Sequence, residues 1–380
     1  MSFKELSIMS DKKGTVLFYP YIPAKSLKIL KNTLSTRWIG QGPMVDKFEK
    51  KFSDIFLKGK ECVSTGSGTD ALHLAYLLAG IKKNDEVITP VFTCTATNIP
   101  LLYIGAKIKF ADVDPKTMNI CITSLKKLIS KKTKAIVCVH YGGIPCDMSA
   151  IRKLAKKYKV KVIEDAAQAL GAEYNNKKIG DISDFTTFSF QAIKHITTGD
   201  GGMLCIKDSK LIDAAKRMRW FGIDRKKKQL GIWENDVKEI GYKYQLTDLG
   251  ASIGYQGLLD FKKILAHRIK INNIYLKNLS KNPNIICIYD HDRKKKSAAW
   301  LFTILIEKKD YLQKKLREKN IETNQVHFRN DKYSIFKKFA KNQKFKNMDK
   351  IEDHYLVLPI HTKVSKEDAE YICKLINSYI

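Results

Sequence analysis

Short runs of β-branched residues alternate with longer helical stretches between about residue 60 and residue 210. The β-branched runs fall at residues 61–64, 86–89, 107–111, 135–139 and 160–163, and the helical patterns between them at residues 70–79, 95–104, 124–129 and 149–157. Strands joined by helical crossovers form a mainly parallel sheet with both faces covered. The sequence therefore predicts an α/β fold, with active groups at the carboxyl ends of the strands.

The length of the chain predicts two domains. A chain of 380 residues exceeds one ordinary hydrophobic core. We expect a large α/β domain over residues 1–250 and a smaller C-terminal α+β domain over residues 251–380. A helical pattern at 247–279 leads out of the first, and the second has strand patterns at 285–288 and 300–306 and helical patterns at 310–319 and 366–379.

The net charge of +30 raises the question of nucleic-acid binding. The lysines are spread over almost every expected helix, and the two lysine triplets, at 226–228 and 294–296, lie in expected loops. This distribution does not favour nucleic acid as a partner. A positive surface still helps to steer a small anionic molecule toward its site.

Hydropathy and the first residues predict a cytoplasmic protein. No run approaches the roughly 20 apolar residues that span a bilayer, so we expect no membrane partner. The start, Met1-Ser-Phe-Lys-Glu-Leu-Ser7, lacks the basic and apolar regions of a signal sequence.

The cysteines and histidines do not have the spacing of a metal site. None of the eight cysteines forms a C-x-x-C pair, and several lie inside apolar runs, as Cys138 does. This pattern is typical of free buried thiols and not of a disulfide framework. The histidines show no close metal-binding spacing, so we expect no metal.

A glycine turn opens the helical pattern that follows the first strand of the α/β region. Its residues are Ser67, Gly68 and Thr69. Backbone N–H groups at a helix N-terminus, with a hydroxyl beside them, form a phosphate site. Many strand–helix turns have the same composition, so this motif alone leaves the question open.

Two further features follow strands of the same sheet. Glu164 and Asp165 come directly after residues 160–163, with Gln168 one turn later, and Lys194 lies five residues after Ser189. An acid there either caps the chain locally or faces a charged partner such as a protonated pyridine nitrogen. Lysine is ordinarily solvated, but partial burial lowers its pKa and frees an imine-forming amine. A phosphate site, an acid and a lysine in this order are the parts that hold pyridoxal phosphate.

Longer motifs in the same order resemble the DegT/DnrJ/EryC1/StrS family of pyridoxal-phosphate sugar aminotransferases. The likeness runs from about Tyr21 to Gly254 and more loosely to Arg329. Its pieces are Gly66-Ser-Gly-Thr-Asp-Ala-Leu72, Thr89-Pro-Val-Phe-Thr-Cys-Thr-Ala-Thr-Asn98, Phe110-Ala-Asp-Val-Asp114, His140-Tyr-Gly-Gly143, Cys146-Asp-Met148, Glu164-Asp-Ala-Ala-Gln-Ala-Leu-Gly171, Phe188-Ser-Phe-Gln-Ala-Ile-Lys-His195, Thr198-Gly-Asp-Gly-Gly202 and Gly241-Tyr-Lys-Tyr244.

This resemblance implies fold type I of the pyridoxal-phosphate enzymes and a role for each matching residue. Lys194 would bind the cofactor covalently and move the proton, Asp165 would face the pyridine nitrogen, and Gln168 would contact the ring hydroxyl. The phosphate would lie against Gly68, Thr69 and Ser189.

Two positions depart from the family's pattern. Lys243 stands where relatives often place an Asn that reaches the phosphate in the neighbouring subunit, and a lysine can serve there as a cation. Cys94 stands where many relatives stack an aromatic ring on the cofactor. Either Cys94 packs against the ring or Phe92 covers it.

For the substrate, the resemblance implies a nucleotide-linked keto-deoxy sugar that enters at the domain boundary. Arginine suits a bidentate grip on its diphosphate, and the candidates are Arg219, Arg225 and Arg329, with His327 nearby. Each fits a surface role equally well. Trp38 and Gly40 belong to a segment that resembles the family's cover over the active site.

The implied reaction moves an amino group from L-glutamate to the sugar's keto carbon, with C4 expected and C3 the alternative, in a homodimer with two shared active sites. The product would enter surface glycans or a glycosylated metabolite. Relatives that dehydrate C3 have histidine in place of the lysine, whereas here His195 only follows Lys194. A basic binding protein without catalysis, and elimination or desulfuration on the same fold, are the remaining alternatives. The nucleotide base stays undetermined.

Overall fold

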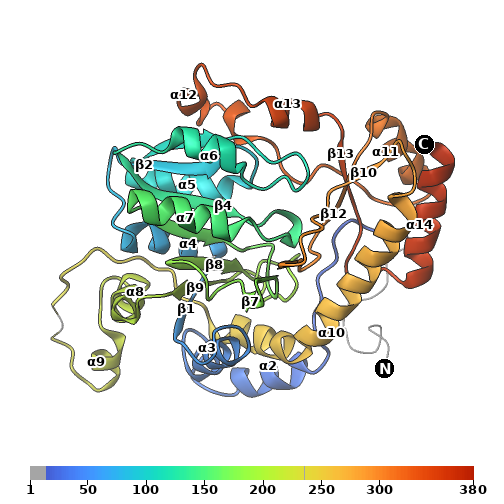
Figure 1. Ribbon diagram of the computed structural model, residues 1–380. Helices are drawn as coiled ribbons and strands as arrows, with labels where there is room; N and C mark the ends of the chain where they lie inside the picture. The colour runs from blue at the N-terminus through green and yellow to red at the C-terminus, as the bar shows by residue number, and fades with distance from the viewer. Residues whose placement is uncertain (1–13, 235) are drawn as a thin grey trace.

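A seven-stranded sheet forms the centre of the protein (Figure 1). The computed structural model describes residues 14–234 and 236–380. The strand order is β1-β9-β8-β5-β4-β2-β3, which is mainly parallel, as predicted. The strands are β1 (Cys62–Thr65), β2 (Glu86–Pro90), β3 (Lys107–Ala111), β4 (Thr133–Val139), β5 (Lys161–Asp165), β8 (Phe185–Ser189) and β9 (Gly202–Ile206).

Helices cover both faces of this sheet (Figure 1). Those of the α/β region are α4 (Gly68–Leu78), α5 (Thr95–Ile104), α6 (Ile122–Leu128), α7 (Met148–Tyr158) and α8 (Ile212–Met218). Before them come α2 (Ser26–Leu34) and α3 (Pro43–Phe56), and after them α9 (Arg225–Gln229), in a segment that extends away from the body. The four helices predicted between strands all form, with ends that differ from the predicted ones by two residues or fewer.

β9 is the one strand of the central sheet that runs against its neighbours. It pairs antiparallel with β8 on one side and with β1 on the other. Both Thr65 and Ser189 stand opposite Gly202 in this pairing. The carboxyl ends of β1 and β8 therefore lie at the same level, which brings the turn after β1 beside the end of β8.

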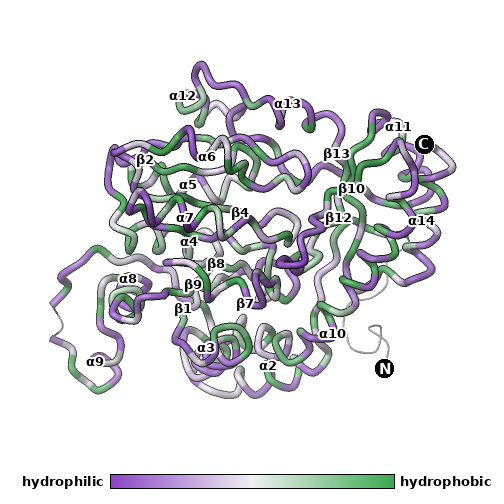
Figure 2. Tube along the Cα trace, in the orientation of Figure 1, coloured by the Kyte–Doolittle hydropathy of each residue, from purple (hydrophilic) through white to green (hydrophobic). Residues whose placement is uncertain are grey.

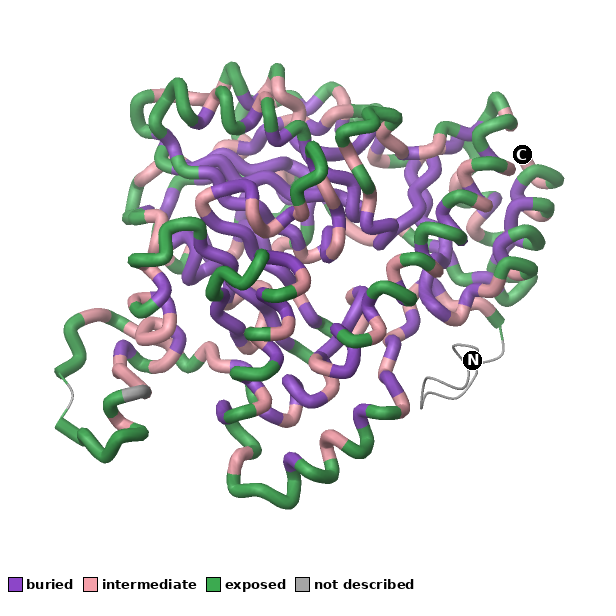
Figure 3. The backbone as a smooth tube through the Cα atoms, turned by 60° about the horizontal axis from the view of Figure 1, so that its bottom comes forward, coloured by how far each residue is buried: buried purple, intermediate pink, exposed green. Residues whose placement is uncertain are grey.

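Aromatic side chains fasten α3 to the sheet. The rings of Phe52 and Phe188 have centroids 5.4 Å apart, and those of Phe48 and Phe190 are 5.1 Å apart, both pairs edge to face. All four side chains are buried. Hydrophobic residues, in green, recur along the central strands in Figure 2, and the centre of the molecule is coloured as buried in Figure 3.

The C-terminal residues contain a second sheet. A three-stranded sheet of order β10-β12-β13 packs with helices from the same region. The elements are α10 (Asp248–Leu279), β10 (Ile286–Cys287), β12 (Phe302–Leu305), α11 (Lys309–Glu318), α12 (Lys337–Ala340), α13 (Lys346–Ile351), β13 (Tyr355–Leu358) and α14 (Lys366–Tyr379). A separate small sheet joins β6 (Glu173–Tyr174), β7 (Lys177–Lys178) and β11 (Lys295–Lys296).

The predicted domain boundary at residue 250 lies inside α10. This unbroken helix packs against α2 and α3 and also against α14. The first described residues also pack on the C-terminal unit, because Thr15 N–H donates to Asn320 O and Leu17 N–H to Glu322 Oε2. The boundary therefore stays a prediction.

Other predictions concern whole-chain properties. All eight cysteines are free thiols. Among the described residues, no helix combines the length and the apolar character needed to cross a bilayer. The start of the chain, on which the expectation about a signal sequence rests, lies outside the described residues.

Asp248, the first residue of α10, holds the N-terminus of α3. Its carboxylate accepts hydrogen bonds from the N–H groups of Gly42, Met44 and Val45 at 2.8–3.1 Å. A carboxylate at a helix N-terminus is favourable because it pairs with N–H groups that lack partners in the helix. This buried contact fixes the segment that contains Trp38 and Gly40 against α10.

We expect Asp248→Asn to lower the free energy of unfolding by about 2 kcal/mol, because an amide replaces one of the charged acceptors. Urea unfolding followed by circular dichroism measures this loss. The control is Asp54→Asn, since Asp54 forms only a surface pair with Lys50. Equal stability of the two variants would contradict the capping role.

Candidate active site

The carboxyl ends of three central strands border one cavity. Its volume is about 630 Å³. Eight of its lining residues were predicted site residues, and they are Gly68, Thr69, Cys94, Asp165, Gln168, Ser189, Lys194 and His327. The fold therefore brings together residues that are up to 259 positions apart in the chain.

The turn between β1 and α4 forms one wall of this cavity. Ser67 caps α4, because its Oγ accepts from Asp70 N–H at 3.0 Å. A Cβ on Gly68 would lie 2.9 Å from Ser189 Cβ, so only glycine allows the helix to start this close to β8. The start of α4 and Ser189 thus adjoin at the cavity, and N–H groups at a helix N-terminus suit an anion.

Asp165 ends β5 and is almost fully buried. Its Oδ2 accepts from Thr97 Oγ1 at 2.7 Å, and its Oδ1 accepts from Ala167 N–H at 3.1 Å. Thr97 in turn pairs with the Thr93 hydroxyl at 2.8 Å. These donors hold the carboxylate in one orientation, and the cavity lies beside it.

Lys194 lies in the loop that follows β8. Burial lowers the pKa of its amine from 10.5 to about 8, an effect that the Asp165 carboxylate and the Cys94 thiol oppose and the Arg268 cation supports. A larger share of this amine is therefore neutral near pH 7 than in an exposed lysine. A neutral amine is the form that attacks a carbonyl group.

Gln168 connects the cavity to the C-terminal unit. Its Oε1 accepts from Gly142 N–H at 2.7 Å, which leaves its Nε2 to donate to His327 Nε2 at 2.9 Å. Burial lowers the pKa of His327 to about 3, with the Lys194 charge as a smaller cause. His327 is therefore neutral and accepts at Nε2.

The structure distinguishes between Cys94 and Phe92. Cys94 precedes α5, is exposed and lines the cavity. Phe92 is buried among Tyr141, His327 and Tyr355, and it is not among the lining residues. Cys94 is thus the residue of the two that can contact a molecule in this cavity.

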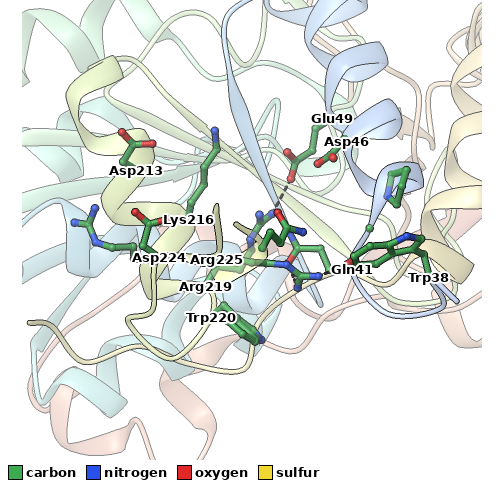
Figure 4. A pocket seen from close by; sticks show the side chains of 14 residues that line it. Trp38, Gln41, Asp46, Glu49, Asp213, Lys216, Arg219, Trp220, Asp224 and Arg225 are labelled. Atoms are coloured by element: carbon green, nitrogen blue, oxygen red, sulfur yellow. Dashed lines mark hydrogen bonds and ion pairs between the residues drawn. The ribbon is translucent and has the colours of Figure 1, made fainter. Parts of the chain in front are cut away.

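Arg219 lines a different cavity, of about 370 Å³, together with Arg225 and Trp38 (Figure 4). Its Nη1 pairs with Glu49 at 2.7 Å and donates to the Ser64 carbonyl at 2.9 Å. The sequence prediction placed Arg219 and Arg225 on the substrate, but within one chain neither lines the Lys194 cavity.

Arg329 also lies outside the Lys194 cavity. Its guanidinium pairs with Asp331, Asp349 and Glu352, and these carboxylates raise its pKa. A guanidinium with three carboxylate partners is already neutralised. Within one chain Arg329 therefore does not line this cavity, and its expected role on the substrate stays a prediction.

Lys243 is exposed and lines a third cavity with Trp38, Gly40 and Trp220. Its Nζ lies 5.2 Å from the ring centroid of Phe221. Within one chain it does not meet Lys194, and its expected role concerns a neighbouring subunit. Its contribution to the site stays a prediction.

Sequence reasoning missed Thr97 and Trp300. Thr97 follows Cys94 by one helical turn, so the predicted helix at 95–104 already placed it on the same side. Trp300 lay in a predicted strand, but β12 begins at Phe302, and the indole lines the cavity instead. No motif in the sequence marked it.

Comparisons with known proteins agree with this site. The sequence model of the DegT/DnrJ/EryC1/StrS aminotransferase family matches residues 20–377. The chain is 33% identical to GDP-perosamine synthase of Escherichia coli O157:H7, over 96% of this chain and 98% of that protein. It is also 33% identical to UDP-4-amino-4,6-dideoxy-N-acetyl-beta-L-altrosamine transaminase of Campylobacter jejuni, over 92% and 93%.

A solved structure extends the likeness to the fold. Helicobacter pylori PseC, an aminotransferase involved in the biosynthesis of pseudoaminic acid, superposes with a TM-score of 0.89 at 26% identity, covering 97% of this chain and 99% of that one. The predicted α/β fold is confirmed.

The lowered pKa of Lys194 is directly measurable. We expect competitive acetylation of the protein, mapped by mass spectrometry, to give half-maximal reactivity of Lys194 at about pH 8, against roughly 10.4 for a lysine peptide. The neutral amine reacts, so reactivity rises with pH. Asp165→Asn should shift the half-maximum to lower pH, because that carboxylate favours the charged form. Reactivity like that of the peptide would place the amine in bulk water.

Proposed function

Because the chain belongs to the DegT/DnrJ/EryC1/StrS aminotransferase family and is a pyridoxal-phosphate-dependent sugar aminotransferase, we propose that it moves an amino group from L-glutamate to C4 of a nucleotide-linked 4-keto-6-deoxy sugar. One observation supports the assignment of the site most strongly. The anion site at α4, the Asp165 carboxylate and the lowered-pKa amine of Lys194 line the same cavity.

The lining residues fit pyridoxal phosphate. Gly68 leaves open the approach to Ser189 that a Cβ would fill, and the N-terminus of α4 supplies donors for a phosphate. Bound there, the cofactor supplies an aldehyde that joins amines and a ring that accepts the electrons of a broken bond. Asp165 holds a proton on the ring nitrogen, and Cys94 lies at the cavity wall to contact the ring.

Lys194 acts as the base and the acid. Its neutral amine would take the proton from Cα of the amino donor, and its protonated form would deliver a proton to the carbon of the cofactor's aldehyde group. The second half-reaction uses the same two transfers in reverse on the sugar. Positioned acid–base groups of this kind contribute roughly 10²–10⁴-fold to a rate.

The histidine beside Lys194 does not replace it. His195 is buried, and its Nε2–H donates to Ala298 O at 2.7 Å. It is not among the residues that line the cavity. This arrangement supports transamination over the dehydration that relatives with histidine at the Lys194 position perform.

The C4 position rests on a relative. The Campylobacter jejuni enzyme named above has a 4-amino-4,6-dideoxy sugar in its name. A cavity of about 630 Å³ is within the range that small-molecule sites occupy. The assay below determines which nucleotide base the sugar carries and whether the amino group is added at C4 or at C3.

We expect Lys194→Ala to lose the violet absorbance of the bound cofactor and to form no amino sugar. The assay incubates protein, L-glutamate and 4-keto or 3-keto sugars linked to GDP, UDP or dTDP, and reads products by mass. Lys207→Ala, at an exposed position after β9, is the control. Multiple turnovers by Lys194→Ala would reject the role of Lys194, and a 3-amino product would replace C4 by C3.

A second copy of the chain completes the site in our proposal. Among the described residues, the lining of the cavity contains one cation, Lys194, beside the carboxylates of Asp165, Asp200 and Glu322. A cofactor phosphate and a sugar diphosphate need more positive charge than this. Two cations outside this cavity are Arg225, the first residue of α9 in the segment that extends from the body (Figure 1), and Lys243, which pairs with Trp220 where that segment ends.

That segment has the character of an interface. The side chains of Leu230, Trp233 and Ile240 are each more than 70% exposed. Large apolar side chains gathered in one exposed segment are typical of a surface that another chain covers. We infer a homodimer in which Lys243 of one subunit approaches the cofactor phosphate of the other.

Mixed dimers test this sharing. We expect Lys194→Ala and Lys243→Ala proteins to be nearly inactive alone, but random exchange of their subunits in a two-fold dimer restores roughly a quarter of the sites. Steady-state activity after mixing measures the recovery. The control mixes Lys194→Ala with Asp165→Ala. Because one chain supplies both residues to its own cavity, each cavity of the mixed dimer keeps one defect and activity is not restored. No recovery with Lys243→Ala would contradict the shared site.

A further inference from the structure

The amine of Lys194 lies against an aromatic ring from the C-terminal unit. Its Nζ is 3.9 Å from the centroid of the Trp300 indole. The indole is buried and lines the cavity. The face of an indole ring carries partial negative charge and attracts a cation, most strongly where water is excluded.

Contacts on several sides fix the Trp300 ring. Its Nε1–H donates to the carbonyl of Ile193, the residue before Lys194, at 3.2 Å. Phe18 stacks with it at a centroid distance of 5.7 Å and an interplanar angle of 24°. The ring therefore has little freedom to follow the lysine, and the lysine must move relative to the ring.

The backbone around Trp300 docks on the turn after β4. Ala298 N–H donates to Gly143 O and Trp300 N–H to Gly142 O, both at 2.9 Å. A Cβ on Gly143, whose φ is +90°, would lie 3.1 Å from Ala299 N. Ala299 itself has a φ of +49°, which an alanine adopts only when its surroundings enforce it. This docking determines where the indole lies.

The charges around the amine come from several elements. Asp165 ends β5, and Cys94 precedes α5. Arg268 lies on α10 and donates to Trp300 O at 3.3 Å. His195 and His327 are both neutral, because burial lowers their pKa. Among the described residues, no carboxylate forms an ion pair with Lys194 Nζ. The ring face is the group that the amine contacts directly.

We propose that Trp300 is a positioning residue that holds the protonated amine of Lys194 at the cavity wall whenever this amine is not joined to the cofactor. The proposal rests on the role proposed for Lys194. An aminotransferase releases its lysine in every half-reaction and needs it again nearby. A ring face attracts the ammonium group without accepting its proton, so the proton stays available for transfer.

Two variants separate the ring face from the indole N–H. Trp300→Leu removes both, whereas Trp300→Phe keeps a ring face and loses only the bond to Ile193. We expect Trp300→Leu to lower the proton affinity of Lys194 roughly fivefold, which moves its half-maximal acetylation to lower pH. Trp300→Phe should show the smaller shift. The protein needs no cofactor for this measurement.

A matched control accounts for general loosening of the core. Phe336→Leu also removes a fully buried ring, and Phe336 does not line the cavity. Its acetylation profile at Lys194 should equal that of the wild type. The proposal is overturned if Trp300→Leu leaves the pH of half-maximal acetylation unchanged or raises it. It is also overturned if Trp300→Phe or Phe336→Leu lowers that pH as much as Trp300→Leu does.

A second measurement uses the wild-type protein without cofactor. The difference in tryptophan emission between wild type and Trp300→Phe should titrate with the same midpoint as Lys194 acetylation, and Lys194→Met should abolish that titration. A pH-independent difference overturns the proposal. Failure of this proposal differs from failure of the proposed function. If Lys194 does not bind the cofactor, Lys194→Met still gains violet absorbance with added pyridoxal phosphate, whatever the Trp300 variants show.

Discussion

Burial of one amine close to a buried carboxylate is the constraint on which the site depends. Desolvation favours the neutral form of Lys194, and the Asp165 charge opposes it without a direct ion pair. The balance leaves the amine able to attack a carbonyl and able to hold a proton within the same pH range. Direct contact with the carboxylate would keep it charged, and full exposure to water would do the same.

Strand β9 makes this arrangement geometrically possible. By running against β8 and β1, it sets Thr65 and Ser189 at one level and leaves room for the turn at Gly68. A Cβ on Gly202 would meet Ser67 O at 2.3 Å, so the strand can support the turn only with glycine there. The proposed phosphate site and the loop that carries Lys194 thus depend on the same strand.

The α/β fold and eight residues that line the Lys194 cavity were predictable from the sequence. The alternation of β-branched and helical runs and the order of the motifs can both be read along the chain. Asp165 follows a run that the pattern marks as a strand, whereas Ser189 and Lys194 were recognised from the order of the motifs, because no strand run was marked before Ser189. The resemblance to a family assigns all three residues roles that remain proposals. The arginines were not predictable in this way. Arg219 fits a phosphate as a residue type, but its partner Glu49 comes from a distant part of the chain. The partners of Arg329 lie within 23 residues of it, but only the fold shows that all three carboxylates converge on its guanidinium. Trp300 was missed for the same reason, since its position follows from docking on Gly142 and Gly143.

Helix α10 has a mechanical role that follows from two of its contacts. Asp248, at its start, accepts hydrogen bonds from the N-terminus of α3. Arg268 lies twenty residues later and donates to the Trp300 carbonyl. At 1.5 Å per residue these contacts are about 30 Å apart on one rigid rod. The same helix therefore supports both the N-terminal segment before α3 and the backbone that places the indole beside Lys194, so a change in its tilt would be felt at both ends.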